Sequence, residues 1–112
     1  MDIFQTTAEP GIVILTLSGK LDAETTPQFA EVINGTIDRG ERRIILDMSA
    51  LDYVSSVGLR ALILGAKRLT PLGGRMVLSG PQDRILKLLE ISGFTSIFTI
   101  TATRDEAAEK LR

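Results

Sequence analysis

A chain of 112 residues, 44% hydrophobic and 24% charged, has the balance of one small globular domain, which we expect to span residues 1–112. Its formal net charge of −1 leaves no basic excess to hold a phosphate backbone, so direct nucleic-acid binding is not expected. The absence of cysteine excludes disulfides and thiolate metal sites. The absence of histidine removes the commonest general base, the commonest metal ligand and any Ser-His-Asp triad.

The first third of the chain predicts two strands. Residues 2–8 alternate weakly between polar and apolar and predict a strand, and residues 12–18 form a β-branched apolar run typical of a buried strand. Pro10-Gly11 between them is a turn signal, so the two strands can pair as a hairpin. Residues 19–22 are expected to be a loop.

A helix is expected next. Either Thr26 caps it with Pro27 at the first helical position, or Thr25 and Gln28 form a capping box. Gly40 is expected to close this helix. Residues 42–47 then predict a strand that is apolar on both faces, which is typical of a parallel sheet covered on both sides.

The centre of the chain carries the most informative stretch. Asp47 marks the carboxyl end of the strand at 42–47, where open α/β sheets place functional loops, and residues 49–54 are expected to be such a loop. The pair Ser55-Ser56 follows. From Val57, apolar residues recur at helical spacing on one face of a helix. The serine pair is therefore predicted to lie at a helix N-terminus.

The last third alternates again between strand and helix. Residues 75–79 predict a strand, and Gly80-Pro81 is expected to open a helix that ends at an αL cap at Gly93. Residues 97–100 predict a final strand, and Thr103 with Glu106 forms a capping box for a last helix. This order predicts an α/β domain with a mostly parallel sheet of about five strands and about four helices.

A helix N-terminus carries unpaired N–H groups and about half a positive charge, so it stabilises a phosphate attached there. Ser55 and Ser56 therefore form a plausible phosphorylation switch, although either serine could simply cap the helix, as serine often does. Asp22 and Asp47 both follow predicted strands and could flank the pair. No metal site and no cofactor are predicted.

An enzyme is not expected. Ser56 lacks both a histidine partner and a Gly-x-Ser-x-Gly elbow, and the chain has no Gly-x-x-x-x-Gly-Lys-Ser/Thr phosphate loop. No apolar run reaches the ~20 residues of a membrane-spanning helix. The N-terminus also lacks the basic and apolar segments of a signal peptide, so we expect a cytoplasmic protein without membrane insertion.

Five blocks of the sequence together resemble a STAS domain, and more closely a stand-alone bacterial anti-sigma factor antagonist. The specific block is Tyr53-Val54-Ser55-Ser56-Val57-Gly58-Leu59-Arg60. The supporting blocks are Gly19-x-Leu21-Asp22, Ile45-Leu46-Asp47-Met48, Leu78-Ser79-Gly80-Pro81 and Leu89-x-x-Ser92-Gly93-Phe94. The resemblance runs from about Ile3 to Leu111.

The resemblance implies a partner-switching mechanism. The unphosphorylated protein would bind an anti-sigma factor, itself a serine kinase of the histidine-kinase-like ATPase type, and so release a sigma factor. Phosphorylation of one serine would break the complex, and a metal-dependent serine phosphatase would restore it. The family's acceptor serine aligns with Ser56. This chain departs from the common Asp-Ser-Ser-Gly pattern, because Ser55 stands at the usual Asp and Val57 at the usual second serine.

The resulting hypothesis is a regulatory binding module in which Ser56 is phosphorylated and Asp47 supports its loop. The residues expected to bind the partner are Asp22, Ser55, Val57, Gly58, Leu59 and Arg60. A second hypothesis is a STAS adaptor subunit of a membrane transport complex, which would bind a transporter ATPase without obligatory phosphorylation.

Overall fold

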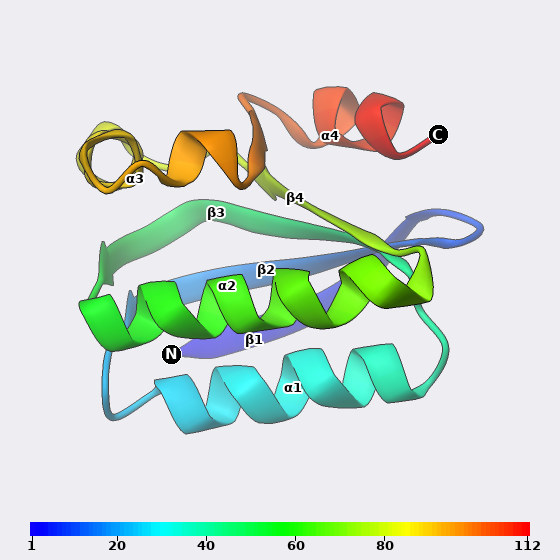
Figure 1. Ribbon diagram of the computed structural model, residues 1–112, viewed down its shortest axis with the longest axis horizontal. Helices are drawn as coiled ribbons and strands as arrows, with labels where there is room; N and C mark the ends of the chain where they lie inside the picture. The colour runs from blue at the N-terminus through cyan, green and yellow to red at the C-terminus, as the bar shows by residue number, and fades with distance from the viewer.

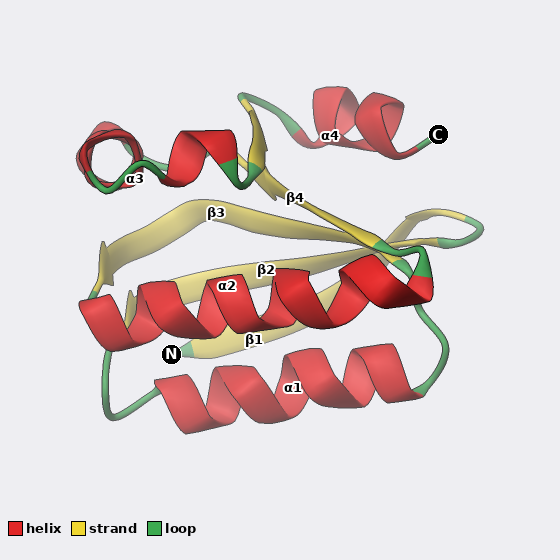
Figure 2. Cartoon of the chain, viewed as in Figure 1, coloured by secondary structure: helices red, strands yellow, loops and turns green.

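The computed structural model describes residues 1–112 and contains one five-stranded sheet and four α-helices (Figures 1 and 2). The strands are β1 (Asp2–Glu9), β2 (Ile12–Leu21), β3 (Arg43–Val54), β4 (Arg75–Ser79) and β5 (Thr99–Thr101). The helices are α1 (Thr26–Asp38), α2 (Ser56–Leu69), α3 (Asp83–Ile91) and α4 (Arg104–Leu111). Short 3₁₀ turns lie at Thr70–Leu72 and Phe94–Ser96. None of the helices has the length and apolar character needed to cross a membrane.

The sheet has the strand order β1-β2-β3-β4-β5. β1 pairs antiparallel with β2 through the turn at Gly11, and every later pair is parallel. The mostly parallel α/β fold predicted from the alternation of elements is therefore confirmed. Each parallel crossover brings the next loop to the same carboxyl edge of the sheet, because parallel strands all end there.

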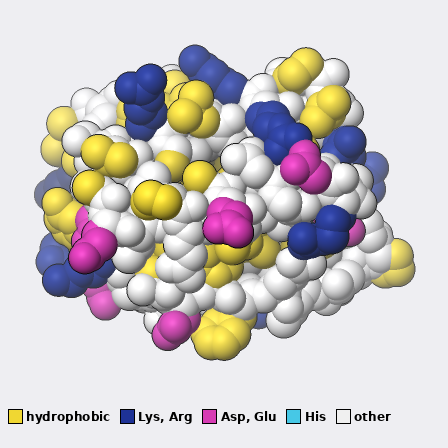
Figure 3. Space-filling view, turned by 90° about the horizontal axis from the view of Figure 1, so that it is seen from below, with side chains coloured by type: hydrophobic (Ala, Val, Ile, Leu, Met, Phe, Trp, Pro, Cys, Tyr) yellow, Lys and Arg dark blue, Asp and Glu magenta, His cyan; other side chains and the backbone are white.

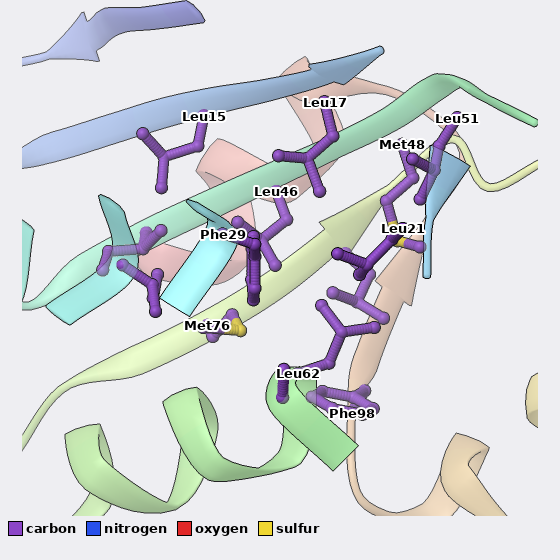
Figure 4. Packing of buried hydrophobic residues seen from close by; sticks show 14 of the residues in the cluster. Leu15, Leu17, Leu21, Phe29, Leu46, Met48, Leu51, Leu62, Met76 and Phe98 are labelled. Carbon is purple, nitrogen blue, oxygen red and sulfur yellow. The ribbon is translucent and has the colours of Figure 1, made fainter. Parts of the chain in front are cut away.

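Helices cover both faces of the sheet: α1 and α2 lie below the strands in the view of Figure 1, and α3 and α4 lie above them. The main core contains 21 buried residues, and its centre is shown in Figure 4, where Phe29 of α1 and Leu62 of α2 lie among residues of β2, β3 and β4. A second cluster of seven residues joins Ala107, Ala108 and Leu111 of α4 to the other face. The amphipathic α2 therefore has a fixed position against the sheet.

The prediction of a loop at residues 49–54 is wrong, because β3 continues to Val54. β2 likewise continues to Leu21 through the predicted loop at 19–22, and the two extensions pair with each other beyond an irregularity near Ala50. Leu51 and Val54 are both buried. Strand pairing and burial thus override the turn-like composition of these segments.

Several helix ends also differ from the predictions. Thr25 is the N-cap residue of α1, but its side chain does not cap the helix, so neither predicted cap forms as expected. α3 begins at Asp83, after Pro81 rather than at it, and the last strand lies at Thr99–Thr101. The cap of α4 is confirmed, because the Thr103 hydroxyl accepts a hydrogen bond from the Glu106 N–H. Gly93 has the predicted left-handed conformation, with φ of 76°.

Candidate functional site

The two adjacent serines at the start of α2 have different environments. Ser55 is the N-cap residue, and its hydroxyl accepts a hydrogen bond of 3.1 Å from the Gly58 N–H. Its own N–H donates to the Leu21 carbonyl at 2.9 Å. Ser56 is the first helical residue and is exposed, and its hydroxyl makes no hydrogen bond within the protein. The Ser55 hydroxyl therefore serves as the cap of α2, whereas the Ser56 hydroxyl is free to interact with another molecule.

We expect Ser55→Ala to lower the free energy of unfolding by about 1 kcal/mol, because it removes the side-chain acceptor of the first turn of α2. Ser56→Ala is the matched control and should stay within about 0.5 kcal/mol of the wild type, since its hydroxyl is exposed and unbonded. Urea unfolding at neutral pH measures both. Equal effects of the two substitutions would contradict the assignment of Ser55 as the cap.

Gly58 and Leu59 lie inside the protein, which corrects their expected role as partner contacts. A Cβ on Gly58 would stand 2.7 Å from the Leu21 carbonyl oxygen and 2.9 Å from Leu21 Cγ. The close approach required at Gly58 is thus between α2 and the end of β2, not between this chain and a partner. Leu59 is 6% exposed and belongs to the core. Both residues position the N-terminus of α2.

Asp22 organises the loop between β2 and α1, beside the serine pair. Its carboxylate accepts hydrogen bonds from the N–H groups of Thr25 at 3.1 Å and Glu24 at 3.0 Å. The Thr25 N–H is the main reason why the pKa of Asp22 lies below its ordinary value; desolvation opposes the shift, while the Glu24 N–H and the charge of Lys20 support it. Asp22 therefore stays ionised and shapes the loop that follows Leu21.

Exposed side chains of α2 form a shallow groove with α1. Val57 is 48% exposed and Leu64 is 55% exposed, and Arg60 is exposed between them. The groove has a volume of about 230 Å³, and it is lined by Thr26, Ala30, Ile33, Asn34, Val57, Arg60, Ala61, Leu64 and Gly65. Figure 3 shows the molecule from the side of α1, where hydrophobic and charged side chains are interspersed. Leu64 was not among the predicted partner contacts; the signal that could have found it is its position beside, rather than within, the buried apolar stripe of α2.

Asp47 does not support the serine loop, which corrects that expectation. β3 runs seven residues beyond it to Val54, a rise of roughly 20 Å. Asp47 is 6% exposed, and its carboxylate accepts hydrogen bonds from the Ser49 N–H at 3.0 Å and from Arg104 Nε at 2.6 Å. Arg104 also donates to the Thr16 hydroxyl at 2.7 Å. Asp47 thus ties α4 to the sheet, and no sequence signal pointed to Arg104 as its partner.

The buried position of Asp47 predicts a pH-dependent stability. Burial alone raises the pKa of Asp47, but the Ser49 N–H, the Ser49 hydroxyl and the Arg104 guanidinium together outweigh it, so the pKa lies below the ordinary value. A depressed folded-state pKa gives stability that is fully present above the unfolded-state value of about 4 and is lost as the pH falls through the folded-state value.

Accordingly, Asp47→Asn should lower the free energy of unfolding by about 2 kcal/mol at pH 7, because it weakens hydrogen bonds to a charged group. The difference in this free energy between the variant and the wild type should shrink below about pH 4. Urea unfolding from pH 7 to pH 3 measures it. Glu31→Gln removes an exposed carboxylate that makes no hydrogen bond and controls for the change in net charge. A constant difference between Asp47→Asn and the wild type across this range would contradict the account.

No group of three or more acidic side chains is placed to hold a metal ion. A second cavity, of about 600 Å³, lies between the start of α3 and the end of β5, and neither serine lines it. The site that the structure assembles is therefore the N-terminus of α2 with the β2–α1 loop and the adjoining groove.

The sequence and the fold are similar to those of known proteins. The model of the STAS domain family matches residues 4–107. BtrV of Bordetella bronchiseptica, named as a candidate anti-sigma factor antagonist, is 39% identical over 98 residues, which cover 88% of this chain and 84% of BtrV.

Two solved structures share the fold. A candidate anti-sigma factor antagonist from Thermotoga maritima has a TM-score of 0.92 and 23% identity, covering 98% of this chain and 94% of that one. The Bacillus cell fate determinant SpoIIAA in its phosphorylated form has a TM-score of 0.77 and 24% identity, covering 99% of this chain and 100% of that one. At these identities the likeness establishes the architecture.

Proposed function

The chain belongs to the STAS domain family, and from this premise we propose that it is an anti-sigma factor antagonist regulated by phosphorylation of Ser56. In its unphosphorylated form it binds an anti-sigma factor and thereby releases a sigma factor. It acts as a binding protein, with the β2–α1 loop, Ser56, Val57 and Arg60 forming the contact surface in the bacterial cytoplasm.

The observation that carries this proposal is that the two adjacent serines have different environments. Ser55 caps α2 and is half-buried, whereas Ser56 is exposed with an unbonded hydroxyl. A phosphate on Ser56 lies at the positive end of the helix dipole, so the fold tolerates it. Its roughly two negative charges nevertheless change what the surface can bind. A solved structure of phosphorylated SpoIIAA, which shares this fold, supports a phosphorylated state of such a domain.

The anti-sigma factor in this proposal is also the kinase, of the histidine-kinase-like ATPase type. The Ser56 oxygen forms a bond to the γ-phosphorus of ATP, the bond between that phosphorus and ADP breaks, and the hydroxyl proton passes to a base of the kinase. A metal-dependent serine phosphatase hydrolyses the phosphoester and returns the chain to its binding form.

Transcription in a purified system tests the function. RNA polymerase with the sigma factor is inhibited by the anti-sigma factor, and adding the unphosphorylated chain should restore transcript. An ATP analogue blocked between its β- and γ-phosphates replaces ATP in the whole mixture, so that Ser56 stays unmodified while the polymerase, which cleaves between the α- and β-phosphates, can still use it. Failure to bind any anti-sigma factor encoded in the organism, together with binding to a transporter ATPase, would contradict the proposal and identify a STAS adaptor of a transport complex.

A further inference from the structure

Arg60 is one of two arginines whose side chains make no hydrogen bond or ion pair. The other, Arg43, pairs beside Arg75 in the sheet, at the opposite end of β3 from the serines. Each remaining arginine donates to a carbonyl, hydroxyl, amide or carboxylate oxygen: Arg39, Arg42, Arg68, Arg75, Arg84, Arg104 and Arg112. Arg60 is exposed on α2 and its guanidinium is unengaged.

The position of Arg60 relative to Ser56 is set by the helix. The two residues are four positions apart in α2, so their Cβ atoms lie on one face about 5–6 Å apart. Long helical side chains tilt toward the N-terminus and cover the residue one turn earlier, which directs the guanidinium of Arg60 toward position 56. An acidic group that precedes a basic one by four residues is also the more favourable order for such a pair.

Of the charged side chains around Ser56, Arg60 is the one placed to bind a negatively charged group at that position. The groove that Arg60 lines contains no carboxylate. On the other side, the β2–α1 loop carries Asp22, which would repel a phosphate, and the charge of Lys20 already acts on Asp22. Arg60 is thus the cation of α2 that is one turn from the phosphorylation site and has no competing partner.

We propose that Arg60 binds the phosphate of phosphorylated Ser56. The inference rests on the function proposed above. The guanidinium donates hydrogen bonds to phosphate oxygens across one helical turn, a geometry suited to bidentate pairing. Phosphorylation then changes the surface twice: it adds the phosphate charge, and it withdraws the Arg60 cation from the groove between α1 and α2. The second change is internal to the chain and needs no movement of the backbone.

The test uses phosphoserine incorporated genetically at position 56 of the full chain, so it does not depend on finding the kinase. The second pKa of the phosphate is measured by ³¹P NMR titration. In the wild type it should be lower than in Arg60→Gln by about 0.3 or more, because the guanidinium favours the dianion. Arg60→Lys should recover part of this difference. Lys67→Gln, which removes an exposed cation two turns farther along α2, should leave the value unchanged.

Two outcomes overturn the inference: the same phosphate pKa in the wild type and Arg60→Gln, or an equal shift caused by Lys67→Gln. The second would show a general effect of net charge. Failure of the proposed function appears separately, as the absence of phosphate on Ser56 when the unmodified chain is incubated with kinases and ATP. A direct coupling between a guanidinium nitrogen of Arg60 and the phosphorus, observed in the wild type, would support the hydrogen bond itself.

Discussion

Phosphoserine at position 56 is expected to weaken binding of the anti-sigma factor by about 100-fold or more relative to the unmodified chain. The phosphate places roughly two negative charges at the centre of the proposed contact surface, where they displace the exposed hydroxyl that the partner meets. An unfavourable charge at an interface costs several kcal/mol, and 1.4 kcal/mol corresponds to a tenfold change in affinity. Calorimetry with the isolated partner measures the difference.

Two control proteins separate this effect from a general effect of phosphate. Ser56→Ala should bind with nearly the affinity of the wild type, because it keeps α2 and its cap intact. Phosphoserine at the exposed Ser92, which lies at the end of α3, should also bind normally. Equal weakening by phosphoserine at positions 56 and 92 would contradict a localised switch.

A methyl group at Gly58 is expected to be the most disruptive single change at the site. The added Cβ would meet the Leu21 carbonyl oxygen at 2.7 Å, and that atom belongs to the backbone of a paired strand. Gly58→Ala should therefore destabilise the chain by about 1–3 kcal/mol, less the gain of up to about 1 kcal/mol that alanine brings to a helix. The first turn of α2 must shift, so partner affinity should fall as well.

Gly65→Ala is the matched control in the same helix. Its Cβ would meet Met76 Cε at 3.2 Å and Ile33 Cγ1 at 3.4 Å, which are ends of side chains that can adjust. Its effect on stability should be close to neutral, and it should leave the N-terminus of α2 in place. Urea unfolding and calorimetry on both variants measure the contrast. A Gly58→Ala protein as stable and as tightly binding as Gly65→Ala would show that the approach of Leu21 does not position the site.

Local patterns predicted most of the fold. The apolar run at 12–18, the alternation of strands and helices and the cap at Thr103 each depend on neighbouring residues, and the structure confirms them. The extension of β3 to Val54 was missed, because it depends on pairing with β2, 33 residues away for Leu21 and Val54. Long-range pairing is not encoded in the turn-like composition of residues 49–54.

The site was predictable only where it depends on neighbouring residues in the sequence. Sequence spacing placed Ser56 at a helix N-terminus, but the choice of Ser55 as the cap required the hydrogen bond to Gly58. The role of Asp47 depends on Arg104 of α4, which is 57 residues away in the sequence. The burial of Leu59 followed from its own helical periodicity, whereas the family resemblance had suggested a partner contact.

The most direct test of the central claim is the intact mass of the chain after incubation with the organism's anti-sigma kinases and ATP. The wild type, Ser56→Ala and Ser55→Ala are compared. We predict one added phosphate on the wild type and on Ser55→Ala, and none on Ser56→Ala. Phosphate that persists on Ser56→Ala and disappears from Ser55→Ala would contradict the account, because it would make the capping serine the acceptor.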